Sequence, residues 1–352
     1  MSDAKPISLV AVGDLMLGDS AKCIGLGVRS ATVGPGAEYL FREVSTHLRG
    51  DIVFGNLECV LSDHDFVGWR FDKAQMRGVS GAARALAGAG ITVLNVANNH
   101  ILQFGAEGFH NTCRAVEAAG IGLIGVRGSA GYCCRPLILP VRGRKVGMLG
   151  YCCEKENYFC GETLYAKGCE EEILRDVFRL RDECDAVVVS VHWGHEFIDH
   201  PSAQMVEFGR KLVDAGCFAV LGHHPHVVQS MEQYGPAVIC YSLGNFVTDM
   251  LWDENLRRGT IVTVELSESG SHARSTCTRV NDDYSVAPLS SGKADDLGNI
   301  SNAGCSYAKR VEFLRKRNRN LSHLYVLRNM LRYHPLMLAQ ILTRSFISMV
   351  GL

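Results

Sequence analysis

Two kinds of hydrophobic pattern alternate along most of this chain. Short apolar runs rich in β-branched residues predict buried strands, and stretches with apolar side chains every three to four positions predict amphipathic helices. The expected strands are Ile7–Val12, Asp51–Phe54, Thr92–Val96, Ile121–Gly125, Lys145–Tyr151, Ala186–Val191, Ala219–Leu221, Ala237–Tyr241 and Thr260–Leu266. The expected helices are Ala82–Ala89, Gly105–Ala119, Glu170–Glu183 and Ser202–Ala215. The alternation predicts an α/β fold around a largely parallel, buried sheet, with an antiparallel addition after Gly235.

Composition places this protein among large globular chains. It has 352 residues, 47% of them apolar and 21% charged, and these values exclude a disordered or collagen-like protein. The net charge of −1 argues against binding nucleic acid through overall basicity, so we expect no specific nucleic-acid partner.

Charge is distributed unevenly between the body of the chain and its C-terminal end. Residues 306–352 carry nine Lys or Arg and one acidic side chain, Glu312, a local +8 that leaves −9 on the preceding residues. We expect a main domain at 1–280, a linker or loop at 281–306, and a basic helical tail at 307–352. Within the tail, Ala308–Tyr333 predicts an amphipathic basic helix and Leu336–Val350 a second apolar segment.

Three interpretations of this basic tail stay open. It packs on the acidic body and neutralises part of its charge, it lies on an anionic lipid surface as a peripheral membrane contact, or it holds a polyanionic polymer such as polyglutamate.

The location of the protein is predicted from the N-terminus and the cysteines. The opening residues have no basic region followed by a cleavable apolar stretch, and no window approaches eighteen consecutive apolar residues. The fourteen cysteines lie in or beside apolar runs, and no C-x-x-C motif occurs. We therefore expect buried free thiols, no signal peptide or transmembrane helix, and a cytoplasmic protein, with peripheral contact at the inner membrane face if the tail binds lipid.

Five apolar strands run directly into short polar signatures. These are VAVGD with Asp14, DIVFGNLE with Asn56 and Glu58, VLNVANNH with Asn98, Asn99 and His100, VVSVHWGHE with His192 and His195, and VLGHHPHV with His223, His224 and His226. The carboxyl ends of parallel strands lie along one edge of a sheet, where ligands bind. We expect these five segments to meet in one pocket.

The side chains expected in this pocket are typical of a divalent metal site. Imidazole suits Zn, Fe and Ni, and carboxylate suits Mn and Mg, so a mixed set favours a borderline ion. Six or more candidate ligands exceed the needs of one tetrahedral ion but suit two ions bridged by a shared carboxylate. Such a pair produces hydroxide at neutral pH, and a histidine outside the ligand set can protonate the leaving group.

Each signature also has a structural interpretation. Asp14 is at a position where turns and helix caps are common, Asn98 and Asn99 suit a left-handed turn, and His192 suits a hydrogen-bonded core position. His224 and His226 are two residues apart, so in extended chain they share one face and both reach a metal.

At these signatures the sequence resembles the CapA family of bacterial capsule or poly-γ-glutamate synthesis proteins, within the metallophosphatase-like (calcineurin-like phosphoesterase) superfamily. VAVGDLMLG, FGNLE, ANNHILQFGAEG, HWGHE, GHHPHV and YSLGNFV match in order and span about residues 7–250. The resemblance implies a metallophosphatase-like four-layer α/β/β/α sandwich, to which the basic helical tail is added, with two divalent ions (Mn, Fe or Zn) at the strand ends.

The resemblance also implies roles for individual residues. Six are implied metal ligands, and they are Asp14, Glu58, Asn99, His192, His224 and His226. His100 is the implied catalytic acid. Four further residues, Asn56, Asn98, His195 and His223, are expected to support these ligands or to replace one of them.

The sequence departs from the superfamily pattern at three positions. Met16 replaces a ligand histidine, Asn56 replaces the bridging Asp, and Gln103 stands where an acid is expected. A neutral Asn56 at the bridging position would leave two cations without a shared anion, so we favour Glu58 as the bridge.

Three hypotheses for function follow. The first is a metal-dependent hydrolase of capsule or poly-γ-glutamate biosynthesis, in which metal-activated hydroxide attacks a phosphoester or amide bond of an anionic polymer or small molecule. The second is a non-catalytic scaffold or polymer-binding component beside the membrane-associated proteins of a polymer synthase or export complex, and a fold with an empty site is a third. Arg70, Lys73 and Arg77 form either a positive lip for the substrate or a solvated loop.

Overall fold

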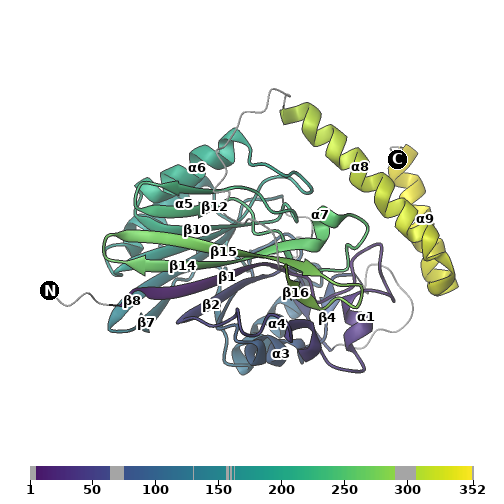
Figure 1. The fold of residues 1–352 in the computed structure, drawn as a ribbon, viewed down its shortest axis with the longest axis horizontal. Helices are drawn as coiled ribbons and strands as arrows, with labels where there is room; N and C mark the ends of the chain where they lie inside the picture. Colours follow the sequence, from purple (N-terminus) through teal and green to yellow (C-terminus); the bar gives the residue numbers. More distant parts are fainter. Residues whose placement is uncertain are drawn as a thin grey trace.

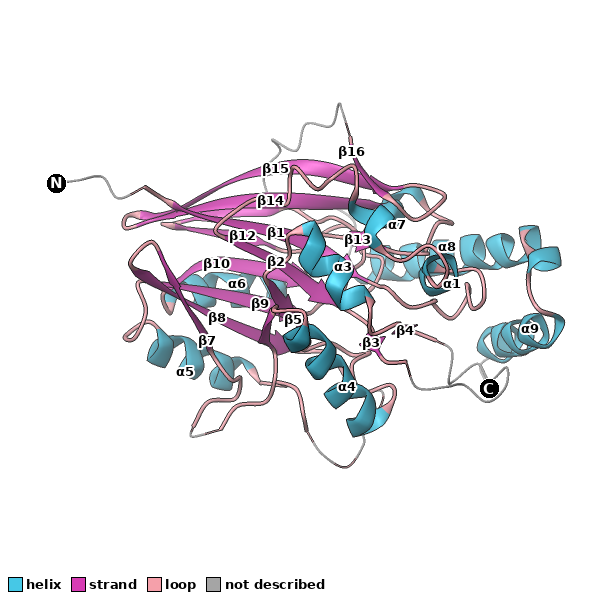
Figure 2. Ribbon diagram, turned by 90° about the horizontal axis from the view of Figure 1, so that it is seen from below, coloured by secondary structure: helices cyan, strands magenta, loops and turns pink. Residues whose placement is uncertain are grey.

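A computed structural model of the chain describes residues 5–63, 75–129, 131–155, 158, 161, 163–289 and 307–350, with side chains described up to 343. The described strands form two large sheets that pack face to face (Figures 1 and 2). A short pair, β3 (Val60–Leu61) and β4 (Arg77–Gly78), lies outside them.

The first sheet contains eight strands and is mixed. Its order is β16 (Val286–Pro288), β15 (Gly270–Val280), β14 (Arg258–Ser267), β1 (Ile7–Leu15), β2 (Ile52–Leu57), β5 (Val93–Asn95) and β6 (Gly122–Ile124), with β13 (Asn245–Val247) paired to β1. Strands β1, β2, β5, β6 and β13 are parallel, whereas β14 runs antiparallel to β1 and to β15. This sheet includes the antiparallel addition expected after Gly235.

The second sheet contains six strands. Its order is β11 (Met231–Tyr234), β12 (Ala237–Cys240), β10 (Cys217–His223), β9 (Ala186–His192), β8 (Arg144–Cys152) and β7 (Leu137–Val141). The four inner strands are parallel and the two edge strands are antiparallel to their neighbours. The prediction of one largely parallel sheet was therefore wrong, because hydrophobic periodicity marks a buried strand but does not say which strands pair.

Three apolar cores separate four layers. One core joins the two sheets through residues such as Leu9 and Phe54 on the first and Val188 and Leu221 on the second. A second core lies between the first sheet and its helices, and a third between the second sheet and its helices. The expected four-layer α/β/β/α sandwich is confirmed.

Helices cover the outer face of each sheet. Those on the first sheet are α1 (Val28–Thr32), the 3-10 helix η1 (Glu38–Phe41), α3 (Ala82–Ala89) and α4 (Gly105–Ala118). Those on the second are α5 (Glu170–Leu180) and α6 (Ala203–Asp214), and α7 (Glu254–Arg257) precedes β14. The four helices expected from the sequence are present, Ala82–Ala89 with the predicted bounds and the other three with ends shifted by one to three residues.

A helical hairpin ends the described chain. Helix α8 (Tyr307–Arg328) is followed by the 3-10 helix η2 (Met330–Arg332) and α9 (Pro335–Val350), and the pair lies at one end of the molecule (Figures 1 and 2). Part of the expected linker is ordered, because Val286–Pro288 forms β16, while residues 290–306 lie outside the described residues. Among the described helices, none is both long and apolar enough to cross a bilayer.

Candidate metal site

Two rows of polar residues meet where the parallel strands end. In the first sheet, Asn245, Asp14, Asn56 and Asn95 occupy the same register on β13, β1, β2 and β5. In the second sheet, His192 on β9 is in register with His223 on β10. The five sequence signatures therefore converge, as expected, but they come from two sheets rather than from one.

Close approach of the backbone fixes the position of Asp14. Gly13 precedes it, and a Cβ atom at position 13 would lie 2.0 Å from the carbonyl oxygen of Gly244. The Asp14 amide donates to that same carbonyl at 2.9 Å. Glycine at position 13 therefore allows β1 and β13 to approach closely enough to align Asp14 with Asn245.

Glu58 lies at the centre of the site. Its side chain is completely buried, and neither carboxylate oxygen has a hydrogen-bond partner. Oε1 lies 3.6 Å from His192 Nε2 and 3.7 Å from His226 Nε2. Burial raises the pKa of this carboxyl group well above its usual value. A buried carboxylate among imidazoles without a hydrogen-bond donor is a suitable ligand for a cation.

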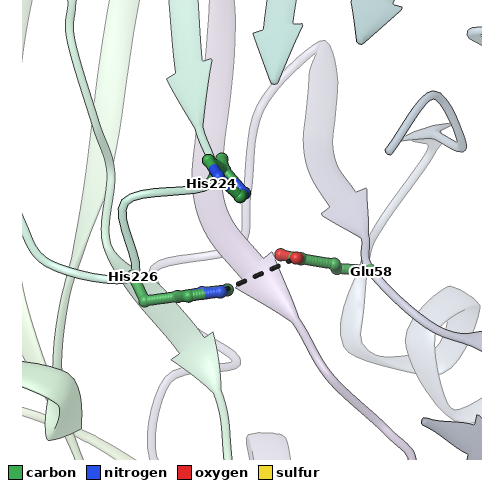
Figure 3. A group of neighbouring side chains, drawn as sticks. All are labelled: Glu58, His224 and His226. Carbon is green, nitrogen blue, oxygen red and sulfur yellow. Dashed lines mark ion pairs between the residues drawn. The ribbon is translucent and has the colours of Figure 1, made fainter. Parts of the chain in front are cut away.

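Glu58 belongs to two groups of potential ligands. In the first, ligand atoms of Glu58, His224 and His226 lie within 4.8 Å of one another (Figure 3). In the second, Asp14, Glu58 and His192 satisfy the same distance. The donors are carboxylate oxygens and imidazole nitrogens, which fit Mn, Fe or Zn. The residues present therefore fit divalent metal binding.

His224 and His226 reach Glu58 from a turn with an unusual backbone. Their φ angles are +95° and +60°, and Phe197, whose ring centroid lies 6.1 Å from that of His226, has a φ of +71°. The expectation that the two histidines share a face of extended chain was wrong, because both follow β10 in a bend. Left-handed backbone at non-glycine residues is strained, and such strain gathers at functional sites.

Asp14 is held by hydrogen bonds. Its Oδ1 contacts Asn56 Nδ2 at 2.9 Å and His223 Nδ1 at 3.0 Å, and its Oδ2 lies 3.4 Å from His226 Nδ1. Burial alone would raise the pKa of Asp14, but the hydrogen bonds from His223 and His226 outweigh it and hold the pKa well below the usual value. Asp14 is therefore an anion at neutral pH.

The two histidines beside Glu58 have opposite pKa shifts. Burial lowers the pKa of His224 to about 4. Burial also acts to lower the pKa of His226, but the carboxylates of Glu58 and Asp14 outweigh it and raise that pKa to about 10. His226 therefore carries a proton at neutral pH unless a metal ion replaces it.

Asparagine side chains orient the ligands. Asn56 donates to Asp14, lies 3.3 Å from His192 Nδ1, and accepts from Asn95. The nitrogen and the oxygen of the Asn56 amide both have hydrogen-bond partners. This arrangement suits a residue that orients the ligands rather than one that bridges two metal ions. Asn245 Oδ1 lies 3.1 Å from His226 Nδ1 and fixes that ring.

Asn98 and Asn99 have different surroundings. Asn99 Oδ1 lies 2.9 Å from His192 Nε2, inside the site. Asn98 donates to the Leu57 carbonyl and accepts from the His100 amide, so it holds the loop that carries Asn99 and His100. Burial lowers the pKa of His192 well below its usual value, which leaves that ring neutral.

His100 lies at the edge of the site. Its Nδ1 is 3.1 Å from Gln103 Oε1, so the residue that replaces an expected acid still orients this ring. Burial lowers the pKa of His100, although the Gln103 hydrogen bond and the charge of Glu196 oppose the shift.

The remaining candidates lie elsewhere. His195 is exposed and contacts Arg315 of α8 at 3.3 Å, so the structure does not bring it to the ligands. Arg77 is buried with its guanidinium 6.0 Å from the Phe104 ring centroid, and it forms neither a lip nor a solvated loop. Arg70 and Lys73 lie outside the described residues.

Two residues around the site, Asn245 and Glu154, were not predicted from the sequence. Asn245 stands in the quoted YSLGNFV signature, and its register opposite Asp14 reveals its role. Glu154 follows β8 and lies 3.8 Å from His224, and burial, then the charge of Glu196, raises its pKa to about 7. No sequence signature marks Glu154.

Comparisons with known proteins identify the family of this chain. Residues 8–250 match the family model described as bacterial capsule synthesis protein PGA_cap. The chain is 30% identical over 279 residues to the capsule biosynthesis protein CapA of Bacillus anthracis, covering 75% of this chain and 65% of that protein. It is 28% identical over 270 residues to the PGA biosynthesis protein CapA of Bacillus subtilis (strain 168), covering 75% of this chain and 69% of that protein.

A solved structure with a similar arrangement is a 5′-nucleotidase described as putative, from Staphylococcus aureus. It has a TM-score of 0.46 and 11% identity, over 89% of this chain and 58% of that one. Because the family match covers residues 8–250, this chain belongs to the bacterial capsule synthesis protein PGA_cap family.

Proposed function

We propose that this protein is a metal-dependent hydrolase that acts on a phosphoester or amide bond during capsule or poly-γ-glutamate biosynthesis. The observation that carries the proposal is the buried Glu58 carboxylate, which has no hydrogen-bond partner and belongs to both ligand groups. Divalent ions held there would supply Lewis-acid activation of water and of the scissile bond. The names of the two Bacillus relatives support the biological process, although this chain spans only about two thirds of their lengths.

Each side chain of the site has a distinct role in this proposal. Glu58, His224 and His226 would hold one cation, and Asp14 and His192, together with Glu58, would hold a second. The Asn99 oxygen that contacts His192 would be a further ligand of the second cation. Asn56 and Asn245 keep Asp14 and His226 in place and bind no metal.

His100 transfers the proton to the leaving group. Gln103 Oε1 accepts from Nδ1, which leaves Nε2 as the nitrogen available to the substrate. Burial keeps His100 neutral in the free protein, and an anionic phosphate or carboxylate group beside it would raise its pKa toward neutrality. The proposal therefore favours an anionic substrate.

Metal analysis combined with an activity screen tests the proposal. Wild type, Glu58→Gln and His100→Ala are loaded with Mn²⁺ or Zn²⁺, freed of excess ion and assayed on an activated phosphodiester and on poly-γ-glutamate. We expect wild type to hold metal and turn over one substrate, Glu58→Gln to lose both, and His100→Ala to lose turnover only. Metal-free wild-type protein would contradict the proposal.

A non-catalytic scaffold is the second candidate, and Met16 and Asn56 favour it because they replace a ligand histidine and a bridging carboxylate of the superfamily pattern. In this case the site holds a substrate carboxylate or has a structural role. Poly-γ-glutamate binding that persists in His100→Ala, without turnover in wild type, would support the scaffold.

A further inference from the structure

The turn between α8 and α9 exposes several large apolar side chains. Leu331 is 97% exposed, Leu336 60% and Leu327 53%. We call residues 324–336 the hairpin tip. Figure 2 shows the hairpin at one end of the molecule, away from the two sheets.

These exposed residues are not the ones that attach the hairpin to the body. Val326, Tyr333 and Met337 are buried in a small cluster with Ile24, and the Tyr333 hydroxyl donates to the Lys22 carbonyl at 2.5 Å. The hairpin thus has an inner apolar face that the body covers and a second apolar group at its tip that the described protein leaves in solvent.

Polar contacts fix α8 at several further points. Trp252 Nε1 donates to Asn318 at 2.7 Å, and Arg317 forms a 3.0 Å ion pair with Asp253. A hairpin anchored in this way presents its tip in a fixed direction.

The charged side chains of the tip itself have one sign. Arg328 and Arg332 are exposed beside Leu327 and Leu331, and the sequence has no acidic residue after Glu312. Cations beside projecting leucines match an anionic bilayer, whose headgroups attract the arginines and whose acyl region accepts the leucines.

We propose that the hairpin tip is a membrane-binding element that inserts Leu327, Leu331 and Leu336 into the interface of an anionic lipid bilayer. A polyanionic polymer would need the arginines but would leave the leucines without a role. This inference does not depend on hydrolysis, because it rests on the hairpin alone.

Vesicle sedimentation of the full chain tests the proposal. Phosphatidylcholine vesicles with about a third phosphatidylglycerol should bind wild type, and pure phosphatidylcholine should bind it roughly tenfold or more weakly. Leu327→Asp combined with Leu331→Asp should weaken binding at least about tenfold, because both side chains leave the acyl region. Arg328→Glu combined with Arg332→Glu should weaken binding roughly tenfold or more.

Matched controls lie on α5, on the opposite side of the body. Phe178 is 45% exposed and Arg175 is exposed, so Phe178→Asp and Arg175→Glu replace an exposed apolar side chain and an exposed cation by acids away from the tip and should bind vesicles like wild type. Circular dichroism should be unchanged in every variant, since the replaced residues are exposed.

Three results would overturn the inference. One is vesicle binding that the tip variants leave unchanged. In the second, wild type does not bind vesicles but binds poly-γ-glutamate, and the arginine variant loses this polymer binding while the leucine variant keeps it. That result would assign the tip to the polymer. In the third, wild type does not bind vesicles, light scattering shows that it self-associates, and the leucine variant abolishes the self-association. That result would assign the tip to a second copy of the chain.

Discussion

Two carboxylates of this protein are equally buried but have opposite surroundings. Asp176 on α5 places Oδ2 within 2.8 Å of the Cys133 amide, 3.0 Å of the Cys134 amide and 2.8 Å of the Tyr151 hydroxyl. Glu58 has imidazoles around it and no hydrogen bond to either oxygen. Hydrogen-bond donors stabilise the first carboxylate as a structural anion.

This difference distinguishes Asp176, a carboxylate that stabilises the fold, from Glu58, a carboxylate suited to bind a metal ion. A buried anion without donors is costly in the metal-free protein, and a cation compensates it. Burial alone would not have distinguished Glu58 from Asp176, whereas the identity of the neighbouring groups does.

The largest expected effect comes from Glu58→Gln compared with Asp176→Asn. Glu58→Gln should lower metal affinity by a factor of about 100 or more and abolish turnover, because the shared anion is lost. Asp176→Asn should leave both unchanged. Elemental analysis measures the metal content of the two variants, and a turnover assay measures their activity. Equal metal loss in both variants would contradict the proposed difference between Glu58 and Asp176.

His100→Ala should lower turnover by a factor of about 100 to 10,000 while metal content stays at the wild-type level. The reason is that the ring contacts Gln103 rather than the ligand groups. Gln103→Ala, which frees the ring without removing it, should cause a smaller loss. Unchanged turnover in His100→Ala would exclude this histidine as the acid.

Asp176→Asn should affect stability more than Glu58→Gln does, the reverse of their expected effects on metal binding. Asp176→Asn should lower the free energy of unfolding by about 1–3 kcal/mol, because two amides and a hydroxyl lose an anionic acceptor. Glu58→Gln should leave the metal-free protein as stable or more stable by up to about 2 kcal/mol, because it removes a buried negative charge that no hydrogen bond stabilises. Urea denaturation with chelator present measures both, and a larger loss in Glu58→Gln would contradict the comparison.

Metal binding should release protons at neutral pH. Burial acts to lower the pKa of His226, but the carboxylates of Glu58 and Asp14 raise it to about 10, so this ring holds a proton that a metal must displace. Apparent metal affinity should therefore increase as pH rises toward 10. Calorimetry in buffers of different ionisation enthalpy should detect at least about one released proton per chain, and none would contradict this protonation state.

The sequence predicted the strands and helices better than their arrangement. Ala82–Ala89 and the other helices of the body follow from apolar periodicity, which is local. The division into two sheets depends on pairing between distant segments. Strand β15 was missed because its GSHARSTCTRV sequence is largely polar and half exposed.

The site shows the same limit. Asp14, Glu58 and His192 were expected from polar residues at strand ends, and the structure brings them together. The contribution of Asn245 arises from its register with Asp14, which only the folded chain reveals. The YSLGNFV motif that contains Asn245 was visible in the sequence, but its pairing with Asp14 was not.

Anomalous diffraction from crystals soaked in Mn²⁺ or Zn²⁺ would locate any bound ion. We predict one peak between Glu58, His224 and His226 and a second between Asp14, Glu58 and His192, with the Glu58 carboxylate touching both. Soaked crystals that diffract well and show no peak within coordination distance of Glu58 would contradict this prediction.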